Sequence, residues 1–484
     1  PYDSGWKVYV DGKLAGEHVG GYDPFSFDIT DLLSKGKKHN ITVKVLDQTD
    51  KWYQPRGKQI MEPHGIWYTP VSGIWQTVWM EAVSPQGLKQ VIATPDIDQQ
   101  QLVIRPQFYG ESMDNKLTVT MMDGKKKVAE KTVNACNENI VVLPVKKPKL
   151  WSPESPFLYD VTYTVKDKDG KVIDEVKSYV GMRKVHLANG YFYLNNQPYY
   201  QRLVLDQGFY PDGVWTAPSD EALRKDIELA KAVGFNGARL HQKVFEERYY
   251  YWADKLGYIT WGESASWGLN VNSDLAARNF IAEWTEIVER DRNHPCVIAY
   301  STGNEIPECV RPEGGEWSKK LAAEVRKYDD TRFVTCGSFQ VEDENPGNVG
   351  YYDYEADEQM LAYPITIADC GDADVLQGDR DYSFMCIERA VRRIIRAGSI
   401  PIIMGGDHSI DETDAQTAVI ADWLNQELTP ENFANSQALY ESLVNAVSTN
   451  ITINDFARYT NFLEEASDRE KPIKAQKTVF DEDL

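Results

Sequence analysis

The hydrophobic pattern of the chain changes near residue 190, and this change constrains the fold more than any other feature. Before it, apolar and polar residues alternate in short runs bounded by turn residues. Residues 6–10, for example, are followed by Asp11-Gly12, a pair that suits a tight hairpin. After it, short apolar runs alternate with longer segments whose apolar residues recur every three or four positions. The sequence therefore predicts β domains followed by an α/β domain, and 484 residues are enough for about three domains.

The first 185 residues are predicted to be β throughout. Further alternating runs, separated by turns rather than by long helices, occur at residues 26–29, 41–45, 74–80 and 158–165. This pattern predicts a jelly roll over residues 1–84 and, because the alternation restarts near residue 85, an immunoglobulin-like sandwich over residues 85–185. The chain opens with Pro1 rather than Met, immediately before a strand. We therefore expect the jelly roll to be truncated at its N-terminus.

An α/β domain is predicted from residue 186 onward. Residues 219–221 (Ser-Asp-Glu) are a helix-start signal, Gly234 is a helix-end signal, and the apolar residues between them share one helical face: Leu223, Ile227, Ala230 and Val233. Similar helices separate short strands predicted at residues 237–241, 258–261, 297–301, 332–335 and 349–352. Repeated β/α units predict a (β/α)8 TIM-type barrel over residues 186–410, with its chemistry at the C-terminal ends of the strands. Residues 411–484 are predicted to be helical.

Composition narrows the classes of partner. The 74 acidic and 52 basic residues give a formal charge of −22, which excludes nucleic acid and anionic membrane surfaces as expected partners because a polyanion would be repelled. The six cysteines are scattered without a C-x-x-C pair, which predicts reduced thiols and favours a cytoplasmic location. The 13 Trp and 27 Tyr residues suit a carbohydrate partner, although the core is the commoner place for any single aromatic residue. The composition does not exclude a homo-oligomer.

Several motifs, in order, resemble glycoside hydrolase family 2, which holds β-galactosidases, β-glucuronidases and β-mannosidases. Asn293-His294-Pro295, an apolar strand and then Gly303-Asn304-Glu305 resemble its acid/base segment. Other matching segments are residues 8–12, 20–25, 73–76, 181–184 and 195–198. The resemblance runs from residue 1 to about residue 363.

The resemblance implies a retaining glycosidase that cleaves a terminal β-linked sugar, nominally a β-galactosidase, without a cofactor or a metal. Such enzymes need two carboxylates about 5–5.5 Å apart. Glu305 would be the acid/base residue, and Asn304 would hydrogen-bond the sugar 2-hydroxyl group. The alternative is that Asn304 and Glu305 only cap a loop.

Other candidates end neighbouring strands. Arg239 and His241 end the strand predicted at residues 237–241, where they either contact substrate or form a buried ion pair. Glu263 resembles the acidic position of the third strand, where it either contacts substrate or supports a residue that does. Tyr352, or else Tyr354, would hydrogen-bond the nucleophile or pack in the core.

The resemblance ends before the nucleophile. The family expects a strand that ends in Glu, and Asp369 stands in that register within residues 364–371. Residues 365–410 instead resemble the agmatinase and arginase family of ureohydrolases, in which the counterpart of His408 binds manganese. No Asp-Ala-His-x-Asp segment follows, and His408 is the last of the seven histidines, so a complete dinuclear site, and hence a bound metal, is not expected.

Two interpretations of the C-terminal part remain open. Residues 365–371 and 401–405 could be strands seven and eight of one divergent barrel, or the chain could be composite. A composite or incomplete barrel would make the protein a carbohydrate-binding protein without catalysis. A manganese ureohydrolase is the least favoured function.

Overall fold

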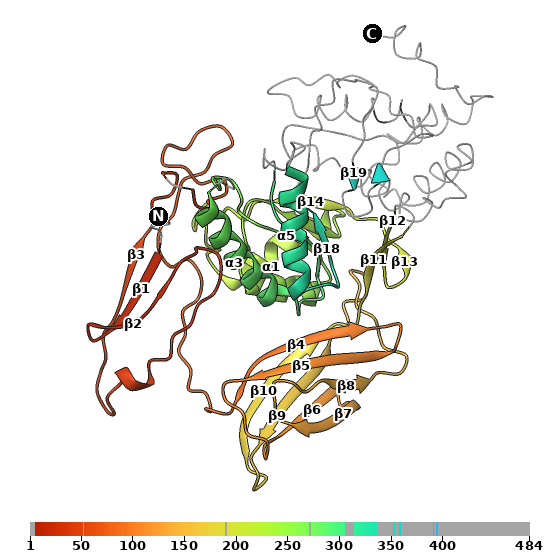
Figure 1. Ribbon diagram of the computed structural model, residues 1–484. Coiled ribbons are helices and arrows are strands. Elements are labelled where there is room, and N and C mark those ends of the chain that lie inside the picture. Colours follow the sequence, from red (N-terminus) through yellow and green to blue (C-terminus); the bar gives the residue numbers. More distant parts are fainter. Residues whose placement is uncertain are drawn as a thin grey trace, which may run out of the picture. The chain divides into compact units, whose positions relative to one another are not determined.

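The computed structural model describes residues 5–304 apart from 52, 189–190 and 271–272, and also residues 314–335, 352–353, 358–359, 391 and 394. Antiparallel sheets occupy the first part of this range, and a parallel sheet with helices follows (Figure 1). The predicted combination of β domains and an α/β domain is thus confirmed. One compact unit, residues 1–198, 205–228 and 236–360, contains all the site contacts discussed below. The domain boundaries at residues 84, 185 and 410 stay a prediction.

The N-terminal region contains a three-stranded antiparallel sheet. Strands β1 (Gly5–Val10), β2 (Lys13–His18) and β3 (Ile41–Leu46) form it in the order β2-β1-β3. The turn between β1 and β2 is the predicted hairpin, and both Asp11 (φ 50°) and Gly12 (φ 82°) adopt the left-handed conformation that such a turn requires. A short 3-10 helix, η1 (Thr30–Leu32), precedes β3.

Two predicted strands in this region are wrong. Residues 26–29 and 74–80 have strand-like alternation, but the structure gives neither a strand conformation. Alternation favours a strand only where a neighbouring backbone is available for pairing. Residues 78–80 lack that neighbour and expose their side chains, as the 65% exposed Trp79 illustrates.

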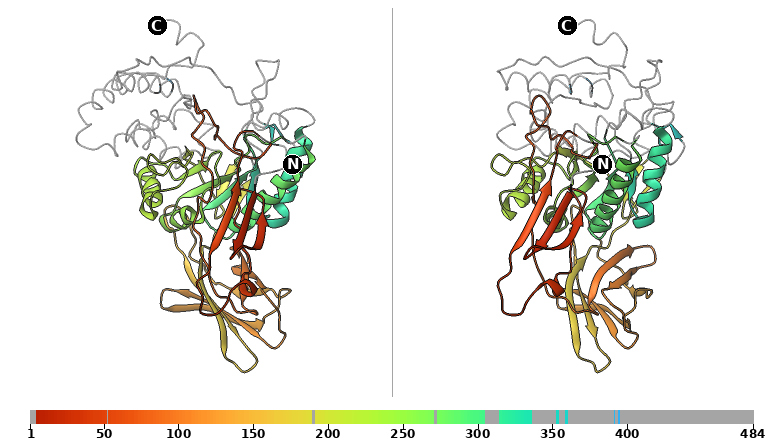
Figure 2. Two further views of the ribbon diagram at one scale, coloured as in Figure 1. Left: turned by 90° about the vertical axis from the view of Figure 1, so that its left-hand side faces the viewer. Right: turned by 60° about the vertical axis from the view of Figure 1, so that its left-hand side comes forward.

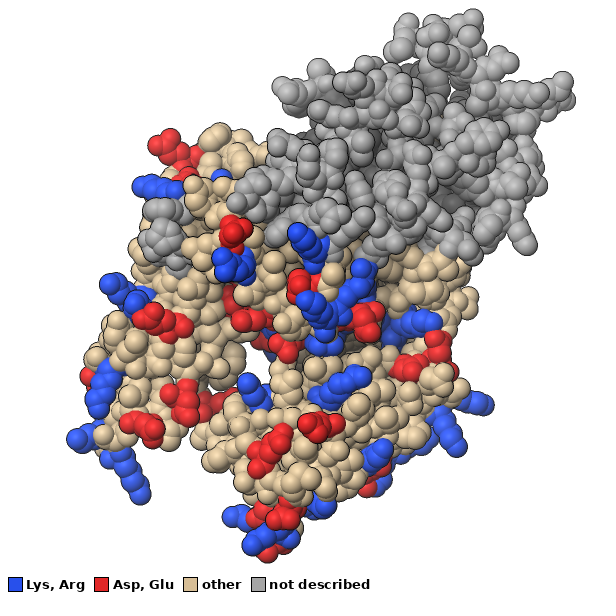
Figure 3. All heavy atoms as spheres, viewed as in Figure 1, with Lys and Arg blue, Asp and Glu red and all other residues tan. Residues whose placement is uncertain are grey.

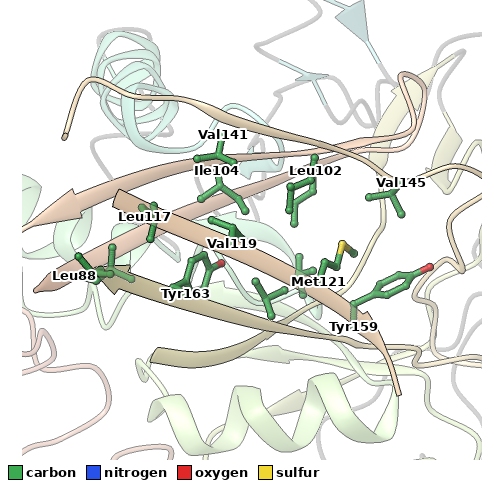
Figure 4. Close-up of a cluster of buried hydrophobic side chains, with 14 of the residues drawn as sticks. Leu88, Leu102, Ile104, Leu117, Val119, Met121, Val141, Val145, Tyr159 and Tyr163 are labelled. Carbon is green, nitrogen blue, oxygen red and sulfur yellow. The ribbon is translucent and has the colours of Figure 1, made fainter. Parts of the chain in front are cut away.

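The sandwich has the seven strands of an immunoglobulin-like domain. One antiparallel sheet has the order β10-β9-β6-β7 and the other the order β4-β5-β8. The strands are β4 (Leu88–Asp96), β5 (Gln101–Phe108), β6 (Lys116–Asp123), β7 (Lys126–Asn134), β8 (Val141–Pro144), β9 (Tyr159–Lys166) and β10 (Val172–Val180). Their inward-facing side chains, including Leu102, Val119 and Tyr163, form one hydrophobic core between the sheets (Figure 4). A small sheet, β11 (Val185–Ala188), β12 (Tyr191–Leu194) and β13 (Gln197–Pro198), follows.

The α/β part is built on a five-stranded sheet in the order β14-β15-β16-β17-β18. Strands β15 to β18 pair in parallel. The strands are β14 (Leu203–Asp206), β15 (Gly237–Leu240), β16 (Ile259–Glu263), β17 (Val297–Ser301) and β18 (Phe333–Thr335). The connecting helices are α1 (Asp220–Ala232), α2 (Glu247–Leu256), α3 (Asp274–Asp291) and α5 (Gly314–Tyr328). Helices α3 and α5 pack side by side (Figures 1 and 2).

The predicted start and end signals of helix α1 are confirmed, but one residue predicted for its apolar face, Val233, is exposed. Ser219 accepts a hydrogen bond from the Ala222 amide at the start of α1, and Gly234 (φ 101°) follows its end. Leu223 and Ile227 are buried as predicted, but Val233 is 50% exposed because it lies beyond the helix, off its buried face.

Of the last predicted barrel strand, residues 349–352, the structure describes only Tyr352, and the rest of that prediction lies outside the described residues. Strand β19 (Tyr352–Asp353) pairs antiparallel with β20 (Glu358–Gln359) in a separate two-stranded sheet, so it does not extend the parallel sheet. A two-residue strand has few backbone groups with which to select a partner, and its sequence pattern cannot distinguish the two pairings.

Charges of both signs are interspersed over the described residues on the face in Figure 3. Pairs such as Lys7–Glu17 and Arg248–Asp220 join exposed side chains, and each stabilises the fold only weakly. Within the described part of the chain, no helix is long and apolar enough to cross a membrane.

Candidate functional site

Four predicted site residues meet at the C-terminal ends of adjacent barrel strands. Arg239 lies near the end of β15, and its Nε atom donates a hydrogen bond to Oε2 of Glu263, the last residue of β16 (2.7 Å). The Arg239 Nη2 atom also donates to Oδ1 of Asn304, three residues beyond β17 (2.6 Å). His241 Nδ1 lies 3.0 Å from Glu263 Oε1, an ion pair whenever the imidazole is protonated. The parallel sheet thus brings together residues far apart in the sequence.

Glu263 is the fully buried centre of this cluster. Its side chain is 0% exposed, and Oε1 also accepts the backbone N–H of Gln242 at 2.9 Å. Burial by itself would raise the pKa of Glu263, but contacts with His241 and Arg239 and the Gln242 amide outweigh it and hold the pKa below the ordinary value. Glu263 is therefore a fixed negative charge that orients Arg239 and His241.

The backbone and side chain of Asn304 are both held in place. Its side chain is acceptor to Arg239, its backbone N–H donates to Ser266 Oγ (3.1 Å), and its carbonyl oxygen accepts the Trp267 indole N–H (3.0 Å). Asn304 is 2% exposed. Because its Oδ1 accepts from Arg239, its amide NH2 group is the donor end of the side chain.

Each of the two alternatives for Arg239, His241 and Glu263 has one observation in its favour. The buried ion pair between Arg239 and Glu263 is present. Arg239 nevertheless keeps 21% of its side chain exposed, and it bonds directly to Asn304. A substrate contact by Arg239 or His241, and by Asn304, stays a prediction.

The Asn293-His294-Pro295 motif has a structural role. Asn293 donates a 2.6 Å hydrogen bond to the Val91 carbonyl and accepts one of 2.9 Å from the Ala93 amide, both in sandwich strand β4. His294 Nδ1 lies 2.6 Å from Asp254 Oδ2. Burial works against the protonated form of His294, and the Asp254 carboxylate favours it, with the net result that its pKa is raised. The motif thus joins the sandwich to the barrel just before the strand that delivers Asn304.

Asp254, His294 and Cys296 also have the spacing of a three-ligand metal group within the described residues. Their potential ligand atoms already make hydrogen bonds within the protein. One oxygen of Asp254 accepts the Cys296 amide, and the other accepts the Tyr179 hydroxyl and contacts His294. The group is therefore a buried hydrogen-bond network, which explains why it is tightly spaced.

Two buried arginines hold the start of β17, and sequence reasoning assigned them no such role. Arg183 donates to the carbonyls of Pro295 (2.9 Å) and Val297 (2.6 Å), and Arg332 donates to those of Val297 (2.8 Å) and His294 (2.8 Å). Burial and the neighbouring positive charge of Arg332 lower the pKa of Arg183 to about 9. The predicted motif at residues 181–184 was the available signal, and its function here is to anchor the strand that carries the site.

A segment of the N-terminal region, residues 54–68, also reaches the site, and no pattern in the sequence predicts this contact. The Arg56 N–H donates to the Trp267 carbonyl (2.9 Å), and the Gly57 N–H donates to the Ala265 carbonyl (3.1 Å). Gly57 has φ 59°, and a Cβ atom there would lie 2.2 Å from the Gln242 carbonyl oxygen. Only glycine permits this approach to the barrel.

The same segment contacts the first barrel strand's loop. The Tyr68 hydroxyl donates to Gln207 Oε1 (2.7 Å), and its ring centroid lies 4.3 Å from that of Phe209. Residues 54–68 therefore contact the loops that follow β14, β15 and β16, which is the edge where barrels carry their chemistry.

The remaining predicted site residues lie outside what the structure describes. Glu305, Asp369 and His408 are not among the described residues, and for Tyr352 only the backbone strand is described. Their roles stay predictions.

A carboxylate cluster lies where the N-terminal region meets α3. Glu283 Oε1 accepts the backbone N–H groups of Gly21 (2.8 Å) and Tyr22 (3.0 Å). Burial and the nearby charge of Asp23 raise the Glu283 pKa from 4.5 to about 7. Folding therefore keeps this carboxyl group protonated at a pH where the unfolded chain ionises it.

We expect Glu283→Gln to stabilise the protein at pH 8 and to change little at pH 4. The folded pKa is raised, so the stabilising contribution of protonated Glu283 is present below about pH 4.5 and is lost as the pH rises toward 7. A shift from 4.5 to about 7 corresponds to about 3 kcal/mol. Urea unfolding of both proteins at pH 4 and pH 8 measures this, and a gain of equal size at both values would contradict it.

Family models agree with the fold and with the change of resemblance. The model described as glycosyl hydrolases family 2 matches residues 89–183, and the one described as the TIM barrel domain of that family matches residues 185–360. Together they cover more than half of the chain. A third model, described as the arginase family, matches residues 345–419 and so overlaps the end of the barrel match.

Curated relatives carry two activity names. A putative β-glucuronidase of Formosa agariphila is 29% identical over 336 residues, which is 67% of this chain and 39% of the relative. A β-galactosidase of Thermoanaerobacter pseudethanolicus is 28% identical over 340 residues, which is 67% of this chain and 44% of the relative. The chain thus spans less than half the length of these relatives.

Solved structures share the architecture. A glycosyl hydrolase family 2 member from Bacteroides cellulosilyticus has a TM-score of 0.58 at 25% identity, over 69% of this chain and 44% of that one. A β-glucuronidase from Ruminococcus gnavus in complex with D-glucuronic acid has a TM-score of 0.59 at 23% identity, over 69% of this chain and 58% of that one. Residues 89–360 of this chain therefore belong to glycosyl hydrolase family 2.

Proposed function

We propose that the protein is a retaining β-glycoside hydrolase that acts on a terminal sugar, with Glu305 as its acid/base residue. The observation that carries the proposal is the Arg239–Glu263–Asn304 network. It fixes Asn304, the residue before Glu305, at the C-terminal edge of the barrel sheet. Polar groups fixed close to the reacting bond favour a transition state in which charge develops on the sugar.

The identity of the sugar is the finer part of the proposal. Relatives named β-glucuronidase and β-galactosidase match the chain to a similar degree. We keep a β-galactoside as the nominal substrate, and a β-glucuronide is the alternative that the relatives' names suggest. Arg239 is a cation that could contact a uronate, but its bonds to Glu263 and Asn304 already use part of its donor capacity.

A panel of 4-nitrophenyl β-D-galactoside, β-D-glucuronide and β-D-mannoside tests the proposal. We expect turnover of at least one member. In the presence of methanol, NMR should detect the methyl β-glycoside as the first product, because a retaining mechanism keeps the anomeric configuration. A methyl α-glycoside, or no turnover by folded protein, would contradict the proposal.

A carbohydrate-binding protein without catalysis is the second candidate. One observation favours it: the family 2 barrel match ends at residue 360, and the arginase-family match covers Asp369, the residue in the nucleophile register. An aspartate is also one methylene group shorter than the expected glutamate, and nucleophile placement tolerates little error. Calorimetric binding of a glycoside without turnover, followed by activity in Asp369→Glu, would identify the nucleophile position as the missing element.

A further inference from the structure

Two tryptophans form a paired aromatic surface beside the site. Trp67, from the N-terminal segment 54–68, and Trp267, from the loop after β16, have ring centroids 5.0 Å apart and ring planes inclined by 50°. Both side chains are only partly buried. Large aromatic surfaces left partly open next to polar site residues are common where a ligand supplies the missing cover.

The orientation of both rings is fixed. The Trp267 indole N–H donates to the Asn304 carbonyl, and the ring lies edge-on to His241 at a centroid distance of 6.2 Å. The Arg56 guanidinium group lies 5.1 Å from the Trp67 ring centroid, and its Nη1 atom donates to the Gln59 carbonyl. Rings held in this way lose little conformational entropy when a ligand binds.

The two tryptophans are more exposed to solvent than three other residues of the site. Glu263, Asn304 and His241 are buried, with exposures of 1%, 2% and 7%, whereas Trp67 and Trp267 are partly exposed. A terminal sugar that contacts Asn304 would occupy the buried level. The group attached to its anomeric oxygen would lie nearer the surface, where Trp267 adjoins Asn304 and pairs with Trp67.

We propose that Trp67 and Trp267 bind the leaving-group portion of the substrate, by stacking on a sugar ring or an aromatic aglycone. This inference rests on the proposed function. It makes residues 54–68 of the N-terminal region a determinant of substrate specificity for the barrel. The expected ligand has an apolar face on the leaving-group side.

The test compares non-hydrolysable ligands that differ only in that group. Binding of phenyl and methyl 1-thio-β-D-galactoside, and of the two corresponding glucuronides, is measured by calorimetry for the wild type, Trp67→Ala and Trp67→Phe. We expect Trp67→Ala to weaken phenyl thioglycoside binding about tenfold, the order of one aromatic pair, and to change methyl thioglycoside binding less than twofold. Trp67→Phe should restore most of the loss because it retains a ring.

Trp79→Ala is the matched control, since Trp79 lies in the same region but is 65% exposed, and it should bind both ligands like the wild type. Equal weakening of phenyl and methyl ligands by Trp67→Ala, or no weakening, would overturn the inference, as would a wild type that binds neither. Ligand discrimination without turnover would leave the inference standing and refute the proposed hydrolysis. Turnover by the wild type, together with unchanged ligand binding by Trp67→Ala, would support the proposed hydrolysis and overturn the inference.

Discussion

Glu305→Gln is expected to slow the hydrolysis of glycosides with poor leaving groups by about 10²–10⁴-fold, the usual contribution of a positioned general acid. Glutamine keeps the shape of the side chain but has no proton to transfer. A 4-nitrophenolate leaves without protonation, so the first step on nitrophenyl glycosides should suffer much less. Steady-state kinetics with a nitrophenyl glycoside and with a disaccharide of the same sugar measure the difference.

Azide provides an independent check of this assignment. It attacks a glycosyl-enzyme intermediate without a general base, so it should partly restore turnover of the activated substrate by Glu305→Gln. Glu324→Gln, a change on α5 that removes an exposed pairing with Lys327, is the matched control and should behave like the wild type. If Glu305→Gln were equally harmless toward both substrates, Glu305 would not be the acid/base residue.

Arg239→Met is expected to lower the free energy of unfolding by about 3 kcal/mol, because it leaves the buried Glu263 carboxylate without its main cation. The same change frees the Asn304 side chain from its 2.6 Å bond. Misplacement of this kind should lower kcat/KM by about 10²-fold. Urea unfolding and glycoside kinetics measure the two effects.

The double variant Arg239→Met/Glu263→Gln separates stability from function. It removes the charge together with its partner, so most of the lost stability should return. The activity should not return, because neither substitution restores the hydrogen bond to Asn304. Recovery of activity along with stability would mean that Arg239 acts only as a structural ion pair.

The order of the domains and most barrel elements could be predicted from the sequence. Strand β17 was predicted at its observed bounds, and helix α1 lies between the predicted start and end signals at residues 219 and 234, because their hydrophobic periods are strong and the helix caps are clear. Residues 74–80 show the limit of this reasoning. Their alternation is as regular as that of β1, yet strand formation also needs a neighbouring backbone, which no local pattern specifies.

The residues of the candidate site could be predicted from the sequence, but their contacts could not. Arg239, His241, Glu263 and Asn304 were identified because they follow or end predicted strands at positions that resemble those of the family, and parallel strands in a barrel direct those ends to one edge. Their hydrogen bonds could not be predicted, since the pairing register decides which atoms meet. The role of Asn293-His294-Pro295 in joining two domains was equally hidden, because its partner strand lies about 200 residues earlier.

The sequence by itself determined the succession of β and β/α units, because these follow from local periodicity, and it identified the polar residues at the ends of the barrel strands through their resemblance to the family. Only the tertiary structure decided that residues 54–68 lie against three barrel loops and that Trp67 pairs with Trp267. Those contacts depend on backbone hydrogen bonds to Trp267 and Ala265 and on the close approach at Gly57. Such contacts are independent of side-chain pattern, and they form only once distant parts of the chain have folded together.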